Sequence, residues 1–170
     1  MEITLLPQQG LKLKGKKVTF GIDVKDAITN FNAVLLTIPD ESVAPLLENT
    51  VVLMGAGDYE VSGVKITGIR GGEEVVYSVS VEGLEIIIGT TEALEKAKHK
   101  IKEHHVAIIS VSHDIDSAFA TGLATNAVIF YGEKAAEVVE HFAKEGVKKE
   151  SKYQVIVDKL PTEMETVLLQ

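Results

Sequence analysis

A run of glycines set among valines and isoleucines places the strongest constraint on this chain. It extends from Gly55 to Ile69 and has glycine at positions 55, 57, 63 and 68. Glycine tolerates sharp turns and close backbone approach, whereas the valines and isoleucines between the glycines favour extended backbone. The pattern predicts a turn followed by a strand of about ten residues, with Gly63 as a candidate β-bulge.

The alternation of apolar and polar residues continues in the next segment. Valine or tyrosine occupies every second position from Val75 to Val81. Successive side chains of a strand point to opposite faces, so this period of two predicts a half-buried strand that forms a hairpin with the strand ending at Ile69. Gly83 is expected to turn the chain into a further strand over 84–88.

The two halves of the chain carry different patterns. Short apolar runs bounded by turn residues predict strands over 2–6, 11–14, 18–24, 33–37 and 51–54. The second half alternates, with helices predicted over 91–103, 114–123 and 133–144, strands over 106–111 and 127–131, and a last pair of strands over 153–157 and 166–169. A meander followed by αβ alternation indicates a layered sandwich with helices outside, an α+β fold, rather than a doubly wound sheet.

Composition limits the classes of function. The 170 residues suit a single domain spanning 1–170, and they include no cysteine, which excludes a disulfide framework, a thiolate metal site and a cysteine nucleophile. A net charge of −8 disfavours binding to a phosphate backbone. No apolar run reaches the roughly 18 residues of a membrane span. We therefore expect a cytoplasmic protein with neither nucleic acid nor membrane as a partner.

Several short segments together carry a resemblance to a known family: 3–6, 14–18, 21–23 and 55–64, continued through 75–88 and 131–136. They are similar to the metallo-β-lactamase superfamily, and in particular to its branch of zinc-dependent hydrolases, which includes sugar-lactone hydrolases. The glycine–acid–Tyr–Glu–Val sequence at 57–61 is the most specific of them. The resemblance implies a compact αββα four-layer sandwich, with one or two metal ions at one edge between the sheets.

The metal ligands of that family are missing from the matching positions. Its His-x-His-x-Asp-His motif falls on 38–43, which reads Ile-Pro-Asp-Glu-Ser-Val, and its glycine–histidine turn falls on Pro7-Gln8-Gln9. Thr90 stands where the family places a bridging aspartate. The resemblance therefore implies the scaffold without its usual metal, and we expect no cofactor. Asp23, which matches a family acid, is expected to hold loop backbone by hydrogen bonds.

One cluster offers a relocated site. His113, Asp114 and Asp116 follow a predicted buried strand and supply an imidazole and two carboxylates. The structural alternative is that Ser112 or Asp114 caps the next helix and Asp116 occupies its first turn. His104 and His105 are expected at a solvated helix end.

Two functions remain open at this point. The first is a metal-free, non-catalytic protein that acts as a binding, regulatory or self-assembling module; it would form a homo-oligomer through exposed strand edges and could hold a small-molecule ligand. The alternative is a hydrolase of a small ester, lactone or phosphoester, using zinc or manganese held by His113, Asp114 and Asp116 together with Asp40.

Overall fold

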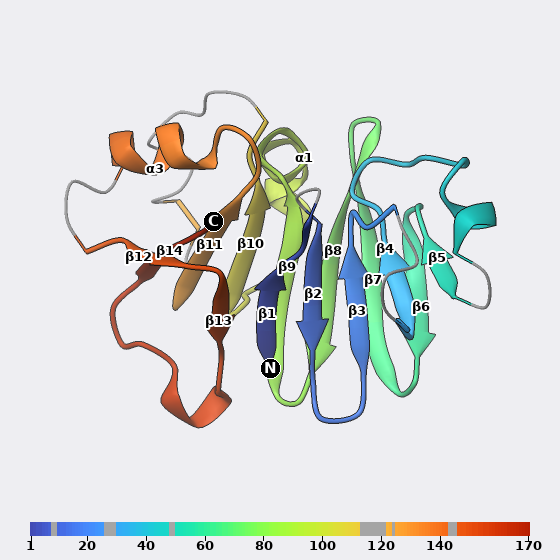
Figure 1. Ribbon diagram of the computed structural model, residues 1–170, viewed down its shortest axis with the longest axis horizontal. Helices are drawn as coiled ribbons and strands as arrows, with labels where there is room; N and C mark the ends of the chain where they lie inside the picture. The colour runs from blue at the N-terminus through green and yellow to red at the C-terminus, as the bar shows by residue number, and fades with distance from the viewer. Residues whose placement is uncertain (8–9, 26–29, 48–49, 113–121, 124, 143–145) are drawn as a thin grey trace.

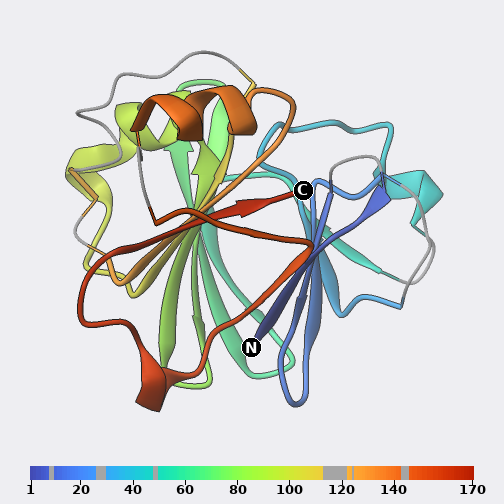
Figure 2. The ribbon, with the colours of Figure 1, turned by 60° about the vertical axis from the view of Figure 1, so that its left-hand side comes forward.

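Two β-sheets packed face to face form the body of the protein (Figures 1 and 2). The computed structural model describes residues 1–7, 10–25, 30–47, 50–112, 122–123, 125–142 and 146–170. The smaller sheet has the strand order β13-β1-β2-β3-β4-β5, and the larger sheet has the order β12-β14-β11-β10-β9-β8-β7-β6. Figure 2 shows helices α1 and α3 on the outer side of the larger sheet.

The elements have the following bounds. The smaller sheet consists of β1 (Glu2–Leu5), β2 (Leu11–Lys14), β3 (Thr19–Ile22), β4 (Ala33–Leu35), β5 (Val51–Leu53) and β13 (Lys152–Gln154). The larger sheet consists of β6 (Gly57–Val61), β7 (Val64–Gly71), β8 (Glu74–Val81), β9 (Leu84–Thr90), β10 (Val106–Ser110), β11 (Ala127–Tyr131), β12 (Lys148–Glu150) and β14 (Glu165–Leu169). The helices are α1 (Thr91–Ala97) and α3 (Ala135–Phe142), and the 3-10 turns are η2 (Ala44–Leu46), η3 (Lys98–Lys100) and η4 (Val157–Lys159).

Alternation along the strands divides the apolar residues between two cores. On β8, Val75, Tyr77 and Val79 face the core between the sheets, whereas Val76 faces the core beneath the helices. The parallel strands β9, β10 and β11 are buried on both faces, so they read as continuous apolar runs. The predicted αββα layering is confirmed.

A third apolar cluster lies on the outer face of the smaller sheet. It consists of Val24, Phe31, Val34, Leu36, Val43 and Leu47. Among the described residues of this stretch of chain, the helical structure is the 3-10 turn η2, which lies between Val43 and Leu47 and has proline near its start. This outer layer is much thinner than the one formed by α1 and α3.

The glycine-rich stretch forms a hairpin and not the single ten-residue strand predicted above. β6 and β7 pair antiparallel, and Val61 faces Val64 across a two-residue turn. Ser62 and Gly63 in that turn have φ values of 53° and 79°. A turn with two left-handed residues matches the twist of the flanking strands, so the chain reverses at Gly63 and does not bulge there. The predicted pairing of the following strand is confirmed, because β7 pairs with β8.

Two glycines of β7 are required by close backbone approach. A Cβ atom at Gly68 would lie 2.3 Å from the carbonyl oxygen of Gly55. One at Gly71 would lie 2.4 Å from the carbonyl oxygen of Ala93, in α1. These separations are too short for any side chain, so β7 is held directly against the preceding loop and against α1.

The last two predicted strands do not pair with each other. β13 pairs with β1 in the smaller sheet, whereas β14 pairs with β11 and β12 in the larger sheet. The last two predicted strands therefore belong to different sheets, and the C-terminal segment crosses from one to the other. The hydroxyl of Tyr153 donates a 3.1 Å hydrogen bond to Glu165 Oε2, which joins the two strands through side chains. Among the described residues, no helix has the length and apolar character needed to cross a bilayer.

Candidate functional site

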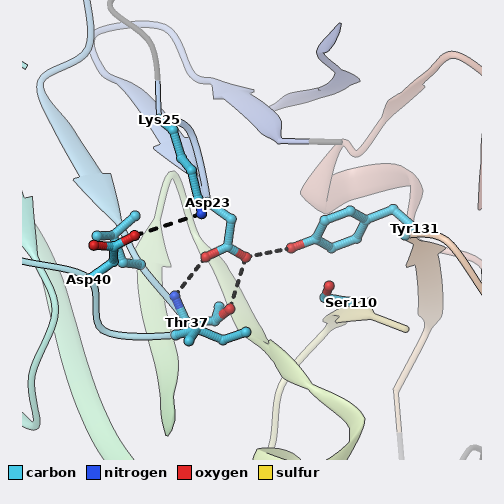
Figure 3. Close-up of a pocket in the computed structure, with 9 residues that line it drawn as sticks. Asp23, Lys25, Thr37, Asp40, Ser110 and Tyr131 are labelled. Atoms are coloured by element: carbon cyan, nitrogen blue, oxygen red, sulfur yellow. Dashed lines mark hydrogen bonds and ion pairs between the residues drawn. The ribbon is translucent and has the colours of Figure 1, made fainter. Parts of the chain in front are cut away.

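A cavity of about 240 Å³ opens at one edge of the sandwich, between the two sheets (Figure 3). The residues that line it are Asp23, Lys25, Leu36, Thr37, Ile38, Asp40, Ser110, Tyr131 and Gly132. They follow or end β3 and β4 in the smaller sheet and β10 and β11 in the larger one. β3 pairs parallel with β4, and β10 pairs parallel with β11. The carboxyl ends of parallel strands meet at one edge, which is the usual position of a site in such sheets.

Asp23 joins the two walls of this pocket. Its Oδ1 accepts a 2.7 Å hydrogen bond from the backbone N–H of Thr37. Its Oδ2 accepts bonds of 2.8 Å from the Thr37 hydroxyl and 3.0 Å from the Tyr131 hydroxyl. Asp23 has a φ of 51°, a left-handed conformation that aspartate tolerates better than most residues. The prediction that Asp23 holds loop backbone is confirmed, and the bond to Tyr131 adds a link to the larger sheet.

Burial controls the ionisation of Asp23 and Tyr131. Removal from water raises the pKa of Asp23, and the hydrogen bonds from Thr37 and Tyr131 oppose that rise without cancelling it. Burial also raises the pKa of the Tyr131 phenol well above its usual value, and the neighbouring Asp23 adds to the effect. The phenol is therefore a hydrogen-bond donor and not a phenolate at neutral pH.

Tyr77 fixes the strands beneath the pocket. Its hydroxyl, on β8 of the larger sheet, lies 2.9 Å from the carbonyl oxygen of Leu53 and 3.1 Å from that of Leu36. Burial raises the pKa of this phenol as well. The backbone N–H of Val75 donates a 2.8 Å bond to the carbonyl oxygen of Thr37. Together these bonds hold the ends of β4 and β5 against the larger sheet.

The mouth of the pocket carries a loose ion pair. Lys25 Nζ lies 3.7 Å from Asp40 Oδ2, and the two side chains are 65% and 36% exposed. Asp40 also accepts a 2.5 Å bond from the Ser42 hydroxyl and a 3.0 Å bond from the Ser42 N–H, which lower its pKa. Ile38 stands beside them with 58% of its surface exposed. An exposed ion pair of this kind contributes little to stability and is free to exchange partners.

The described residues do not fit a zinc ion at this edge. Structural and catalytic zinc sites use at least three nitrogen, sulfur or carboxylate ligands from the protein. Both oxygens of Asp23 already accept hydrogen bonds, and no group of three His, Asp or Glu side chains gathers anywhere among the described residues. Thr90 caps α1 by accepting a 3.1 Å bond from the Ala93 N–H, and it also hydrogen-bonds to Glu74.

The sequence-predicted candidates have mixed outcomes. His113, Asp114 and Asp116 lie outside the described residues, as do positions 114–121 of the helix predicted over 114–123, so both readings of that cluster stay predictions. Gly122 and Leu123, which end the predicted helix, are described and are not helical. Asp40 lies in the pocket, at its mouth.

The adjacent histidines of the second half are not at a solvated helix end. His104 and His105 are both half-buried, and α1 ends at Ala97 rather than near residue 103. His105 Nδ1 accepts a 2.9 Å bond from the Glu85 N–H. Burial lowers the pKa of His104. The His105 side chain therefore joins the start of β10 to β9.

Sequence reasoning missed Thr37, Ser110 and Tyr131 as pocket residues. Each lies at or just past the end of a predicted strand, and their common position at strand carboxyl ends is the only signal in the sequence. Hydroxyl residues at strand ends are too common to indicate a site without the sheet order.

Comparisons with known proteins show which solved structures share this architecture. No protein-family model and no curated protein matches the chain. A Thermotoga maritima structure assigned to the Zn-dependent hydrolases of the metallo-β-lactamase superfamily is similar, with a TM-score of 0.75, 19% identity, and coverage of 99% of this chain and 97% of that one. The Bacillus subtilis metallo-β-lactamase fold protein YhfI is also similar, with a TM-score of 0.56, 5% identity, and coverage of 98% of this chain and 95% of that one.

A third similar structure carries a named activity. The isothiocyanate hydrolase from Delia radicum gut bacteria gives a TM-score of 0.58, with 10% identity and coverage of 98% of this chain and 96% of that one. At identities this low, the similarity concerns the arrangement of the sheets and helices and does not extend to the chemistry of the site.

Proposed function

Since this chain has the metallo-β-lactamase fold, we propose that it is a binding module that takes up a small polar molecule in the pocket between its sheets, without a metal ion and without catalysing a reaction. The fold is shared with hydrolases, but the site decides the function. The pocket in this chain is built from hydroxyl groups, one buried acid and a loose ion pair at its mouth.

The observation that carries this proposal is the engagement of Asp23. A carboxylate that binds a metal shares the ion with at least two further protein ligands, and one that activates water keeps most of its lone pairs open to water. The oxygens of Asp23 instead accept three hydrogen bonds, from the Thr37 N–H, the Thr37 hydroxyl and the Tyr131 hydroxyl. The residue therefore braces the pocket, and bracing of this kind gives a preorganised cavity that suits binding.

The segment that follows β4 supports the same proposal. At the positions where the resemblance expects the metal-binding motif, Ile38 presents an exposed aliphatic side chain. Asp40 is engaged by Ser42 and Lys25. These side chains form a mouth that is part apolar and part charged, and such mouths are common in small-molecule sites.

A second candidate function has one observation in its favour. Ser110, at the end of β10, lines the pocket, and His113, Asp114 and Asp116 follow it closely along the chain. These three residues and Asp40 would be the ligands of a zinc or manganese ion in a hydrolase of a small ester, lactone or phosphoester. The experiment below separates this candidate from the binding module.

Metal analysis of the protein purified without chelator tests the proposal. We expect less than stoichiometric zinc, manganese and iron, and no rise in Tm when zinc is added. The binding module is wrong if the protein holds one equivalent of metal that is lost in His113→Ala while the variant stays folded. Asp58→Asn is the matched control, because Asp58 accepts a 2.8 Å bond from Thr67 on the β6–β7 hairpin and does not line the pocket.

Two properties of the whole protein belong to the same proposal. We propose a homo-oligomer, supported by the exposed Val51 on the edge strand β5. We also propose a cytoplasmic location, supported by the absence of cysteine from the sequence.

A further inference from the structure

The charges around the pocket do not balance. Among the described residues that line it, Asp23 and Asp40 are acids and Lys25 is the one base. Lys25 pairs with Asp40 at the mouth, 3.7 Å away. Asp23 receives hydrogen bonds only from the neutral groups of Thr37 and Tyr131. Among the residues that the structure describes, the inner carboxyl group therefore has no cation bonded to it, although the charge of Lys25 acts on it from the mouth.

A buried carboxylate without a cation is costly, and a cation beside it recovers much of that cost. Neutral donors stabilise a carboxylate less than charged donors do, because a charge-assisted bond is roughly twice as strong. A carboxylate has about four lone-pair positions. The three bonds that described residues make to Asp23 leave one position, on Oδ1, where the Thr37 N–H is the described donor. Figure 3 shows this carboxyl group at the centre of the labelled pocket residues, between the Thr37 and Tyr131 walls.

From this charge arrangement, and resting on the proposed binding function, we propose that the ligand is a small primary ammonium compound whose –NH₃⁺ group binds Asp23 and whose short aliphatic chain lies along Leu36 and Ile38. An ammonium group offers three donors. One can bind Asp23, and the Ser110 hydroxyl on the opposite wall, which interacts with the Tyr131 phenol, has a lone pair that can accept another. The ligand then brings the pocket to neutrality.

Other ligand classes fit the charges less well. Among the described lining residues, a carboxylate or phosphate would meet two acids and one base, Lys25, so its binding would leave the pocket with a net negative charge. A neutral alcohol or sugar would leave Asp23 without a cation. The whole chain carries a net charge of −8, which attracts cations and repels anions over longer distances. The aliphatic side chains of Leu36 and Ile38 favour an organic cation over a hydrated metal ion.

The test uses the full chain and three probes that each contain four carbon atoms. They are n-butylamine, butan-1-ol and butyrate, at matched ionic strength. Binding is measured by isothermal titration calorimetry and by the change in Tm. We expect n-butylamine to bind and to raise Tm, and the alcohol and the acid to do neither. Potassium chloride at the same concentration serves as a control for a general effect of cations.

Two substitutions connect the binding to Asp23. Asp23→Asn removes the charge but keeps an acceptor for the Thr37 N–H, and we expect it to weaken n-butylamine binding by on the order of tenfold or more. Asp40→Asn makes the same change at the exposed mouth, and we expect it to weaken n-butylamine binding much less. If Asp23→Asn does not fold by circular dichroism, Ser110→Leu is the second variant. It fills the cavity without replacing any of the groups that donate to Asp23, and it should abolish binding.

Several outcomes overturn the ammonium proposal. They are equal binding of butan-1-ol or butyrate, equal stabilisation by potassium chloride, no binding of n-butylamine, and unchanged binding in Asp23→Asn or Ser110→Leu. If the alcohol or the acid binds and Ser110→Leu abolishes that binding, the ammonium class is wrong and the binding function stands. One equivalent of zinc or manganese in the purified protein overturns both.

Discussion

The Tyr131 hydroxyl donates a 3.0 Å hydrogen bond to Asp23 Oδ2, and this bond connects residues 108 positions apart in two different sheets. Tyr131 ends β11 in the larger sheet, whereas Asp23 follows β3 in the smaller one. Both side chains line the pocket. The same bond therefore shapes the pocket and holds the sandwich together.

Removal of this bond should cost stability. Tyr131→Phe takes one donor away from a buried carboxyl group, and we expect the free energy of unfolding to fall by about 1–3 kcal/mol. Urea unfolding measures the change. Tyr153→Phe is the matched control, because its hydroxyl bonds to Glu165 in a half-buried position, and its loss should be smaller. Equal losses of unfolding free energy in the two variants would show that the Asp23–Tyr131 bond contributes no more to stability than a half-buried hydrogen bond does.

The raised pKa of Asp23 predicts how the stability of the protein changes with pH. Burial raises this pKa in the folded state above the unfolded value of about 3.9, so the folded protein holds the proton more tightly. The contribution of Asp23 to stability is then fully present below the unfolded pKa and falls as pH rises through the folded pKa. Among the residues that the structure describes, the other ionisable groups that interact with Asp23 are Lys25, Tyr131 and Tyr77.

The measurement is the difference in unfolding free energy between the wild type and Asp23→Asn at several pH values between 4 and 8. This difference cancels the groups that the two proteins share. We expect the wild type to lose stability relative to the variant as pH rises. A difference that is constant with pH, or that moves in favour of the wild type, would contradict a raised pKa.

The glycines of the β6–β7 hairpin should differ sharply in their tolerance of alanine. A Cβ at Gly68 would lie 2.3 Å from the Gly55 carbonyl oxygen, whereas a Cβ at Gly63 has nothing within 4 Å. Gly63→Ala is strained only by its φ of 79° and should cost about 1–2 kcal/mol. Gly68→Ala must displace backbone and should cost clearly more. Thermal unfolding of both variants checks this order.

The proposed homo-oligomer can be tested at the edge of the smaller sheet. Val51 lies on the edge strand β5 and is 50% exposed. If this edge joins two copies, light scattering should give a mass above that of one chain, and Val51→Lys should reduce it to one chain, because charge on an edge strand opposes pairing. Ile156→Lys, at an exposed position elsewhere, is the control. A monomeric wild type would end this proposal.

Much of the fold could be predicted because local patterns carry it. The alternation from Val75 to Val81 predicted β8, and the apolar runs over 106–111 and 127–131 predicted β10 and β11. The error at Ser62 and Gly63 has a local cause as well: a serine in a left-handed conformation is uncommon, so a single glycine indicated a bulge rather than a two-residue turn.

The site was harder to predict because it depends on sheet order. Asp23 and Tyr131 are brought together by two sheets whose packing no local pattern specifies. The separation of the last two predicted strands into different sheets has the same origin. The resemblance located the edge at which the pocket lies, but the residues that replace the family's ligands, such as Thr37, had no pattern of their own.

The division of the pocket between the two sheets has a consequence for local opening motions. Any fluctuation that separates the ends of β3 and β4 from those of β10 and β11 also destroys the pocket. A bound ligand must therefore slow amide hydrogen exchange in both sheets together, since binding stabilises only the closed form. Protection that spreads to strands on either side of the sandwich would mark the pocket as the point where its two halves open as one unit.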